Sequence, residues 1–332
     1  MHQPYLSVVI PVYNEGENLE SLFIRLTAVL DWIGRSYEIV FCNDGSSDNS
    51  IVLLREFHRR SPREVRIIDF NGNFGQHMAI MAGFERSRGE RVVTLDADLQ
   101  NPPEEIHKLL AAMDDGADYV GGVRRVREDS WWRRRASRLM NRLRERITRI
   151  RMTDQGCMLR AYSRDIVDAV AAAREVSTYI PALAYTFAHH PVEVDVLHEE
   201  RAAGESKYSM YRLIRLNFDL ITGFSLVPLQ LFSVAGMIVA LSSVVLYVFV
   251  IAQRAIVGGF VEGIKAFWDR DILAFFLIGC IMFGVGLLGE YVGRIYQQVR
   301  DRPRYVIRAV LERDVATEVP ARQGVESVQL IR

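Results

Sequence analysis

Cysteine is scarce in this chain of 332 residues, and its three cysteines, Cys42, Cys157 and Cys280, are widely spaced within apolar runs. An odd number at such spacings argues against a disulfide framework or a cysteine-based metal site, and favours small buried residues in a reducing compartment. The seven histidines also lack the spacing of metal ligands. No basic stretch precedes the first apolar run, which ends by Val12, so we expect no signal peptide.

Two nucleotide-binding signatures are missing as well. No Gly-x-Gly-x-x-Gly follows the first apolar run and no Gly-x-x-x-x-Gly-Lys-Ser/Thr occurs anywhere, so neither a dinucleotide cofactor nor a P-loop is supported. Basic and acidic residues balance at 41 each, and we expect no nucleic-acid partner. The charge is nevertheless segregated, because residues 124–151 contain twelve arginines and three acids and carry +9, against −9 elsewhere.

What the chain does contain, up to about residue 122, is an alternation of β-rich runs and helical patterns. Strands are predicted at 6–12, 37–43, 65–70, 91–95 and 118–123, with helices between them, for example at 18–32 and 102–114. This order indicates βαβ units and an α/β fold with a mostly parallel, Rossmann-like sheet covered on both faces. Ligands of such sheets bind beyond the carboxyl ends of the strands, where Asp44 and the acidic stretch 96–100 fall.

Residues 130–151 form a basic amphipathic pattern. Apolar residues recur three or four positions apart, arginines fill most other positions, and Trp131 and Trp132 stand near the start. This composition is expected of a helix lying in a membrane interface, and a solvated arginine-rich helix packed on the sheet would share it.

Two later segments, 227–251 and 272–293, are each long enough to cross a hydrocarbon core of roughly 30 Å. The first has no ionisable residue, and the second has only Glu290 near its end, with glycines that permit close helix packing. We therefore predict two transmembrane helices rather than two helices of a soluble core. Such an anchor favours the interfacial interpretation of 130–151. Basic residues flank the outer ends of the pair, so the positive-inside rule places both termini in the cytoplasm.

These patterns divide the chain into four parts. Residues 1–205 are predicted to form a cytoplasmic domain that includes the basic helix, and residues 206–226 a juxtamembrane amphipathic helix. Residues 227–293 contain the transmembrane pair, and residues 294–332 form a cytoplasmic C-terminal tail.

The stretch TLDADLQNPPEE, residues 94–105, places Asp96, Asp98 and Gln100 at alternate positions after a strand. In extended backbone these side chains would point the same way. Such a row of hard oxygen ligands suits Mg²⁺ or Mn²⁺ whose coordination is completed by water and substrate phosphates. A strand end followed by an acid-capped helix start would produce the same spacing, and Asp44 could likewise belong to a turn capped by Asp48. The spacing alone leaves both interpretations open.

Four motifs together resemble the inverting GT-A glycosyltransferases of family two: PVYNE (11–15), NDGSSD (43–48), NFGQ (73–76) and DADLQNP (96–102). The membrane segments that follow resemble the polyprenyl-phosphate branch of that family. Further motifs, namely SRLMNRL (137–143), GCMLRAY (156–162) and GESKYS (204–209), are similar to those of enzymes that transfer 4-deoxy-4-formamido-L-arabinose to undecaprenyl phosphate. The resemblance spans about residues 6–308.

On the donor side, the resemblance implies a UDP-sugar held at the strand ends. Asp44 and Asp96 would hold the uridine part, and Asp98 and Gln100 would ligate Mn²⁺ or Mg²⁺ bridging the diphosphate. Three further residues would lie beside the base: Pro11, Tyr13 and Glu15.

On the acceptor side, the resemblance implies undecaprenyl phosphate in a membrane, bound by cationic side chains. Arg124 and Arg138 would bind the lipid phosphate, and Lys207 with Arg201 would close on the phosphates. Two polar residues, Ser137 and Asn141, lie near Arg138 in the basic helix. Asp154 stands where related enzymes carry an acid beside the acceptor, either orienting it or acting as a base; a turn residue before a strand is the alternative interpretation.

The implied reaction is attack of a lipid phosphate oxygen on the anomeric carbon, which displaces UDP with inversion at the cytoplasmic face of a bacterial inner membrane. A phosphate monoester has a second pKa of about 6, so the nucleophile is already largely deprotonated and needs no general base. Related membrane enzymes assemble as tetramers, so the resemblance also implies a homo-oligomer.

The donor sugar and the enzyme class have alternatives. Formamido-arabinose would imply lipid A modification and polymyxin resistance, whereas glucose or an N-acetylhexosamine would imply decoration of O-antigen or other envelope glycans. A processive polysaccharide synthase would carry Gln-x-x-Arg-Trp, which is absent. A membrane scaffold or flippase would explain the helices but not the acidic cluster, and a soluble nucleotidyltransferase would explain only the cluster.

Overall fold

The computed structural model describes residues 3–124, 150, 152–173, 179–199, 270–299 and 303–312, with scattered residues between 227 and 242. These residues belong to two compact units, a sheet domain that includes 303–312 and a helical unit that includes 270–299. The predicted basic helix apart from Ile150, the juxtamembrane segment 206–226 and the end of the tail from residue 313 lie outside the described residues.

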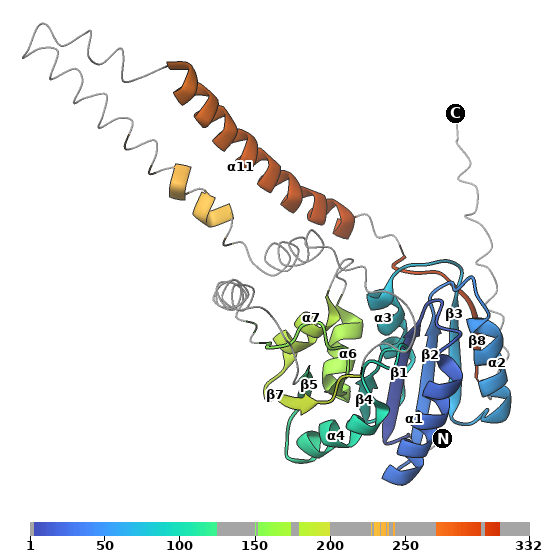
Figure 1. Ribbon diagram of the computed structural model, residues 1–332. Helices are drawn as coiled ribbons and strands as arrows, with labels where there is room; N and C mark the ends of the chain where they lie inside the picture. The colour runs from blue at the N-terminus through green and yellow to red at the C-terminus, as the bar shows by residue number, and fades with distance from the viewer. Residues whose placement is uncertain are drawn as a thin grey trace, which may run out of the picture. The chain divides into compact units, whose positions relative to one another are not determined.

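The sheet domain alternates strands and helices as the sequence predicts (Figure 1). Its described strands are β1 (Leu6–Val12), β2 (Tyr37–Asn43), β3 (Val65–Phe70), β4 (Arg91–Thr94), β5 (Tyr119–Arg124), β6 (Arg160–Ser163), β7 (Pro191–Val196) and β8 (Ile307–Leu311). Its described helices are α1 (Leu19–Ile33), α2 (Ser50–Arg60), α3 (Gln76–Arg86), the short 3₁₀ helix η1 (Pro103–Glu105), α4 (Ile106–Asp114), α6 (Arg164–Ala172) and α7 (Ile180–Phe187).

The eight strands form one sheet in the order β7-β5-β6-β4-β1-β2-β3-β8. β1 pairs in parallel with β2 and β4, β2 pairs in parallel with β3, and β5 pairs in parallel with β7. β6 runs antiparallel between β4 and β5, and β8 runs antiparallel beside β3. The prediction of a mostly parallel α/β sheet is therefore confirmed, and the antiparallel strands were not foreseen.

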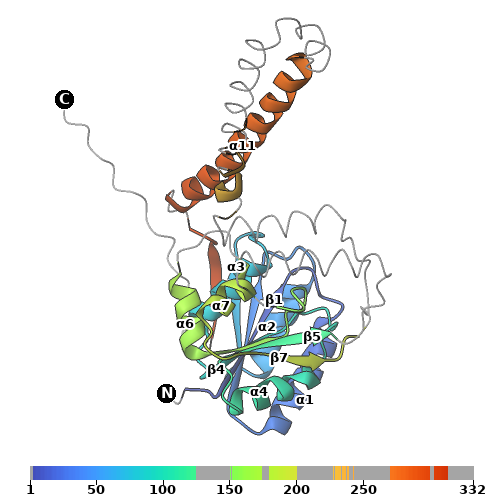
Figure 2. The same ribbon diagram turned by 90° about the vertical axis from the view of Figure 1, so that its left-hand side faces the viewer.

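Helices cover both faces of this sheet. α1 packs against α2 and η1, whereas α3, α6 and α7 pack against one another (Figures 1 and 2). The apolar residues of α1 recur at helical spacing, so they form one face that is buried against the sheet: Leu19, Leu22, Phe23, Leu26 and Leu30. The helix ends where Gly34 adopts a left-handed φ of 68° and donates its amide to the last carbonyls.

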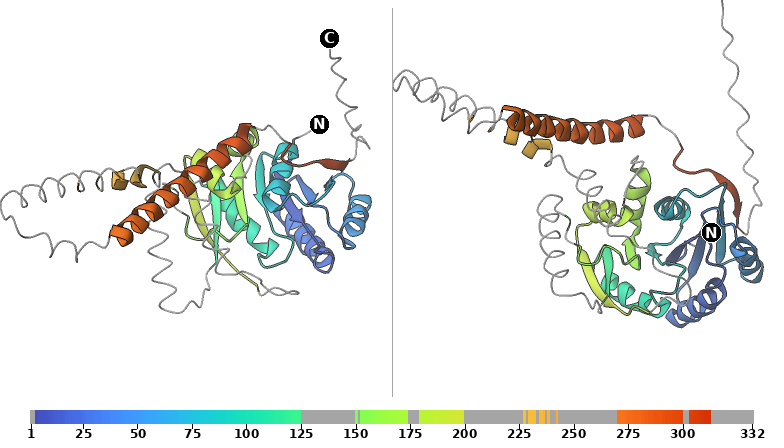
Figure 3. Two further views of the ribbon diagram at one scale, coloured as in Figure 1. Left: turned by 90° about the horizontal axis from the view of Figure 1, so that it is seen from above. Right: turned by 45° about the horizontal axis from the view of Figure 1, so that its top comes forward.

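Strand β8 corrects the prediction that residues 294–332 form a tail. Ile307–Leu311 pair with β3 at the edge of the sheet, and the red strand lies beside the blue strands in Figure 3. Without β8, β3 would present a row of unpaired backbone groups, so the segment covers an otherwise open edge. Five residues with only modest alternation gave too weak a signal to be recognised in the sequence.

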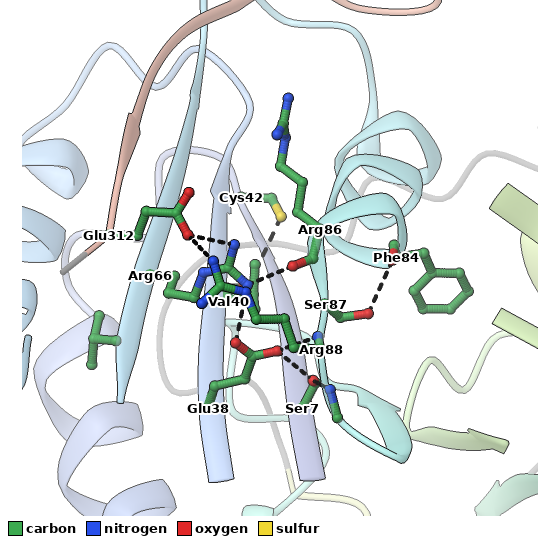
Figure 4. Close-up of polar contacts among 12 residues, drawn as sticks. Ser7, Glu38, Val40, Cys42, Arg66, Phe84, Arg86, Ser87, Arg88 and Glu312 are labelled. Carbon is green, nitrogen blue, oxygen red and sulfur yellow. Dashed lines mark hydrogen bonds and ion pairs between the residues drawn. The ribbon is translucent and has the colours of Figure 1, made fainter. Parts of the chain in front are cut away.

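A network of ion pairs and hydrogen bonds, buried at Ser7, Glu38 and Arg66 and exposed at Arg88, joins the amino ends of β1, β2 and β3 to the end of β8 (Figure 4). Arg66 contacts Glu38 at 3.0 Å and Glu312 at 2.8 Å, and Arg88 contacts the same Glu312 at 2.5 Å. Glu38 also accepts a hydrogen bond from the hydroxyl of Ser7 at 2.6 Å. We call these five residues the amino-end network. It ties the segment after the predicted membrane helices into the sheet domain.

The helical unit contains α11 (Arg270–Val299), and the residues described between 227 and 242 are also helical. The ring of Phe232 lies against α11, where a Cβ added to Gly284 would come within 2.2 Å of it. Glycine therefore permits close helix packing at this point, as the sequence predicts. Measured over the described residues alone, no helix combines the length and the hydropathy needed to cross a membrane.

Candidate active site

The carboxyl ends of the parallel strands bring the candidate residues to one edge of the sheet. Asp44 directly follows β2, Asp96 lies just beyond β4, and Arg124 is the last residue of β5. β4 and β2 flank β1, and β5 is separated from β4 by the antiparallel β6 alone. The topology thus places these residues where α/β sheets bind their ligands.

Asp44 is held by the backbone of the loop that precedes α3. The amides of Phe74 and Gly75 donate to its two carboxylate oxygens at 2.6 and 2.8 Å. Gly75 has a φ of 94°, a conformation that L side chains rarely adopt, so glycine permits this loop. Burial raises the pKa of Asp44, and the two amide hydrogen bonds oppose that shift. The NFGQ motif therefore contributes a loop that orients an acid.

Asp96 lies at the centre of the acidic edge. The side-chain amide of Gln76, the first residue of α3, donates to its Oδ1 at 2.6 Å. Burial, then the charge of Asp98 and more weakly that of Glu15, raise the pKa of Asp96 to about 7, against the opposing effects of Gln76 and Arg124. These electrostatic effects place all five side chains in one neighbourhood. The sequence analysis assigns Gln76 no role, although its position after the third strand indicates that it lies at the same edge of the sheet.

The backbone from 96 to 100 is not extended, so the prediction of a straight row of ligands is wrong. β4 ends at Thr94, and Leu99 has a φ of 62° although its side chain is buried. A left-handed conformation is unusual for a bulky residue and marks local strain. Asp98 accepts a hydrogen bond from the amide of Gln100 at 3.1 Å, closing a turn. Burial of Leu99 fixes this turn, and Asp98 stays close enough to influence Asp96.

Arg124 and Asp154 form a two-pronged ion pair. Nε and one terminal nitrogen of Arg124 donate to the two carboxylate oxygens at 2.6 and 2.8 Å, and the amide of Gly156 donates to the same carboxylate at 3.0 Å. The two side chains are only 16% and 8% exposed. A Cβ on Gly156 would lie 2.6 Å from Arg124, so this approach depends on glycine. Two residues predicted to serve the acceptor are thus brought together.

The residues predicted to lie beside the base occupy β1 and the loop after it. Pro11 is buried within β1 and lies opposite Cys42 of β2. The pairing of β1 with β4 ends at Val9, so the missing N–H of Pro11 is tolerated on that side. Tyr13 is 49% exposed, which leaves its ring accessible. Glu15 accepts a hydrogen bond from the side chain of Asn18 at 2.7 Å.

Comparison with known proteins gives the family. Residues 7–171 match the family model for glycosyl transferase family 2. The chain is 48% identical over 309 residues to an undecaprenyl-phosphate 4-deoxy-4-formamido-L-arabinose transferase of Edwardsiella ictaluri, which covers 92% of this chain and 94% of that protein. Proteins of the same name from Serratia proteamaculans and an Enterobacter species are 50% and 49% identical over 92% and 93% of this chain, and 94% of each relative. The chain belongs to glycosyl transferase family 2.

Solved structures with a related arrangement are more distant from this family 2 glycosyltransferase. Glucosyl-3-phosphoglycerate synthase from Mycobacterium tuberculosis, in complex with Mn²⁺, UDP and phosphoglyceric acid, is 16% identical with a TM-score of 0.47. The match covers 66% of this chain and 76% of that one.

The acidic edge of this glycosyltransferase has a donor set that fits a divalent cation. Asp98 supplies hard carboxylate oxygens, and a cation bound there would offset its repulsion with Asp96. Within the described part of the chain, no group of three or more His, Cys, Asp or Glu side chains is arranged to hold a metal by itself.

Several predicted site residues lie outside the described residues. They are Ser137, Arg138 and Asn141 in the predicted basic helix, and Arg201 and Lys207 before the first predicted membrane helix. Among the predicted residues that are described, Glu15, Asp96, Asp98 and Arg124 share one neighbourhood, and Asp154 joins it through Arg124.

Proposed function

We propose that this glycosyltransferase transfers 4-deoxy-4-formamido-L-arabinose from a UDP donor to undecaprenyl phosphate with inversion at the anomeric carbon. The choice of sugar and lipid follows the relatives, which carry that name at 48–50% identity over nearly the whole chain. The observation that carries the mechanism is the juxtaposition of an excess of carboxylates around Asp96 with the guanidinium of Arg124. One end suits a cation-bound diphosphate, and the other suits an anionic nucleophile.

At the donor end, the uridine part binds between Asp44, Asp96 and the exposed ring of Tyr13, with Pro11 and Glu15 nearby. Asp98 and Gln100 would hold Mn²⁺ or Mg²⁺. When bound, the ion neutralises the charge that builds on the leaving diphosphate. This assignment agrees with the raised pKa of Asp96, because a proton or a cation is needed there to offset the neighbouring acids.

At the acceptor end, Arg124 brings the lipid phosphate towards the sugar, and Arg138, Lys207 and Arg201 assist it, with Ser137 and Asn141 beside them. Two anions must approach each other in this reaction, so cationic groups lower its barrier more than a base would. Guanidinium groups suit this task because they present paired donors to phosphate oxygens.

Asp154 acts in this proposal by orienting Arg124. Its carboxylate already accepts hydrogen bonds from Arg124 and from the amide of Gly156, which occupies lone pairs that a general base would need. A lipid phosphate that is already deprotonated makes a base unnecessary. Asp154 therefore fixes the direction of the guanidinium.

The enzyme is further proposed to be anchored in the bacterial inner membrane by helices at 227–251 and 272–293, with the sheet domain and both termini in the cytoplasm. Four nearby residues of α11, Ile281, Met282, Phe283 and Val285, expose 64, 68, 65 and 62% of their surface. Successive helix residues point about 100° apart, so apolar side chains surround the helix, as a lipid environment favours. We also propose a homo-oligomer, which light scattering of the detergent-purified protein would test.

The function is tested by a transfer assay in detergent with Mn²⁺, undecaprenyl phosphate and a panel of UDP-sugars, followed by mass detection of the lipid product. Product from the formamido-arabinose donor alone supports the proposal. Preference for UDP-glucose or a UDP-N-acetylhexosamine would replace the sugar and retain the mechanism. Full transfer by Asp98→Asn would remove the proposed metal role, and binding without transfer by the wild type would favour a scaffold.

A further inference from the structure

Two side chains connect the donor half of the site to the acceptor half. Gln76, which binds Asp96, is followed by His77, whose ring meets the ring of Tyr179 edge-on at 5.2 Å and 84°. The hydroxyl of Tyr179 donates to the carbonyl of Gln155, the residue after Asp154. A continuous path of contacts therefore runs from Asp96 to Asp154 through two residues of different helices, at the start of α3 and immediately before α7.

His77, the second residue of α3, is partly exposed. Its Nδ1 is buried and has no hydrogen-bond partner among the described residues. Burial lowers its pKa to about 4, so the ring is neutral at cytoplasmic pH and packs as an uncharged aromatic group.

The loop 154–157 is also held from the opposite side. Arg160 is fully buried, and its guanidinium donates to the carbonyls of Asp154 at 2.6 Å and Cys157 at 2.8 Å and to the hydroxyl of Tyr119 at 2.5 Å. With Tyr179 on Gln155, three of the four carbonyls of this loop accept a hydrogen bond from a side chain. The loop carries the carboxylate that orients Arg124, so these bonds determine where Arg124 points.

We propose that His77 and Tyr179 are positioning residues that hold the loop 154–157 at a fixed distance from the start of α3, and so keep Arg124 aligned with Asp96. The assignment of the two halves to acceptor and donor rests on the proposed function. Displacing one reactant by about 1 Å can cost about a hundredfold in rate, so a contact that fixes this distance affects turnover more than binding.

Tyr179→Phe tests the proposal because it removes the hydroxyl and keeps the ring. The full-length wild-type protein in detergent is first assayed with the panel of donors, and the variants are then assayed with the donor that it uses. An error in the proposed sugar is therefore detected before the variants are compared. We expect kcat to fall at least about tenfold while the KM for the donor and the affinity for UDP with Mn²⁺ change less than about twofold. Tyr185→Phe, a matched change on α7 where the ring packs on Tyr119, should leave kcat unchanged.

Two variants of His77 separate positioning from general packing. His77→Phe keeps a ring against Tyr179 and should retain at least about half of kcat, whereas His77→Leu should lose about as much as Tyr179→Phe. The double variant His77→Leu with Tyr179→Phe should be no slower than the slower single variant, because both break one connection.

Three results with the Tyr179 and double variants would overturn the proposal. They are wild-type kcat in Tyr179→Phe, parallel loss of UDP affinity and kcat, and multiplicative losses in the double variant. Equal inactivity of His77→Phe and His77→Leu would also contradict it, since that would give the imidazole nitrogens a direct role. The thermal unfolding midpoint of each variant is compared with that of Tyr185→Phe, which shows whether the variant has lost its fold. If Tyr179→Phe or His77→Leu does not fold, the kcat of the folded His77→Phe variant tests the proposal.

Discussion

The two ends of the parallel strands carry polar clusters of opposite design. In the amino-end network, the two carboxylates of Glu38 and Glu312 are matched by the guanidinium groups of Arg66 and Arg88. At the carboxyl edge, Glu15 and Asp98 lie near Asp96, while the nearby Arg124 is already paired with Asp154. One cluster is neutral and closed, and the other carries an excess of negative charge.

This difference separates structural from functional use of buried charge. A buried ion pair such as Arg66 with Glu38 specifies a packing arrangement, and removing one partner destabilises the fold. At Asp96, burial and then the neighbouring carboxylate of Asp98 raise the pKa, and a proton or a bound cation would balance the excess negative charge. The excess of acids at one edge is therefore the physical mark of the ligand site.

The largest expected effect on stability comes from the closed cluster. Glu38→Gln removes one of the two carboxylates that pair with Arg66 and should lower the free energy of unfolding by about 1.5–3 kcal/mol, with kcat changed less than about twofold in protein that remains folded. Denaturant unfolding of the detergent-purified chain measures this. Glu90→Gln, a change of an exposed glutamate, is the matched control and should stay within about 0.5 kcal/mol of wild type.

The acidic cluster at the carboxyl edge should show the opposite effect, with a loss of activity and no loss of stability. Asp98→Asn removes a proposed metal ligand and relieves repulsion with Asp96, so transfer should fall at least about a hundredfold while the unfolding midpoint stays equal or rises. Initial rates with Mn²⁺ and calorimetric titration of UDP with Mn²⁺ check both parts. Asp115→Asn, at an exposed turn, is the control, and a large loss of stability in Asp98→Asn would contradict the contrast between the clusters.

A smaller effect is expected at the acceptor end. Gly156→Ala places a methyl group 2.6 Å from the end of the Arg124 side chain, which can move aside at little cost in stability. We expect transfer to fall about tenfold, mainly through the KM for the lipid, because the guanidinium loses its direction. Gly72→Ala, whose added Cβ would approach no atom closer than 4.0 Å, is the comparison, and equal kinetics in the two variants would remove the positioning role of Asp154.

The most gradual effect is a dependence of stability on pH. The folded pKa of Asp96, about 7, exceeds its ordinary value of 3.8, so the folded state holds a proton that the unfolded chain releases, and metal-free protein should lose stability as pH rises through this window. His77, whose pKa is lowered from 6.5 to about 4, contributes the opposite slope over its own window. The difference between wild type and Asp96→Asn isolates the first effect, and identical pH profiles would contradict it.

Much of this architecture was readable in the sequence. The first five strands, the helices between them and the edge that carries the acids follow from local periodicity and from motifs in short contiguous stretches. A β-rich run before a helical pattern fixes the direction of a strand, and parallel strands then place their carboxyl ends together. Asp44 and Asp96 could be assigned to one edge for this reason, whereas Arg124 was assigned through the family resemblance.

Tertiary structure decided what depends on residues far apart in the chain. Two examples are the pairing of Arg124 with Asp154 and the contact of His77 with Tyr179, which join segments whose local sequences do not indicate the partner. The left-handed turn at Leu99 was likewise not predicted. Strand β8 is the clearest case, because Ile307 pairs with Phe70 only after the chain has passed through the helical unit. Periodicity reports which face of a segment is apolar, whereas the identity of the segment that covers it is set by packing in three dimensions.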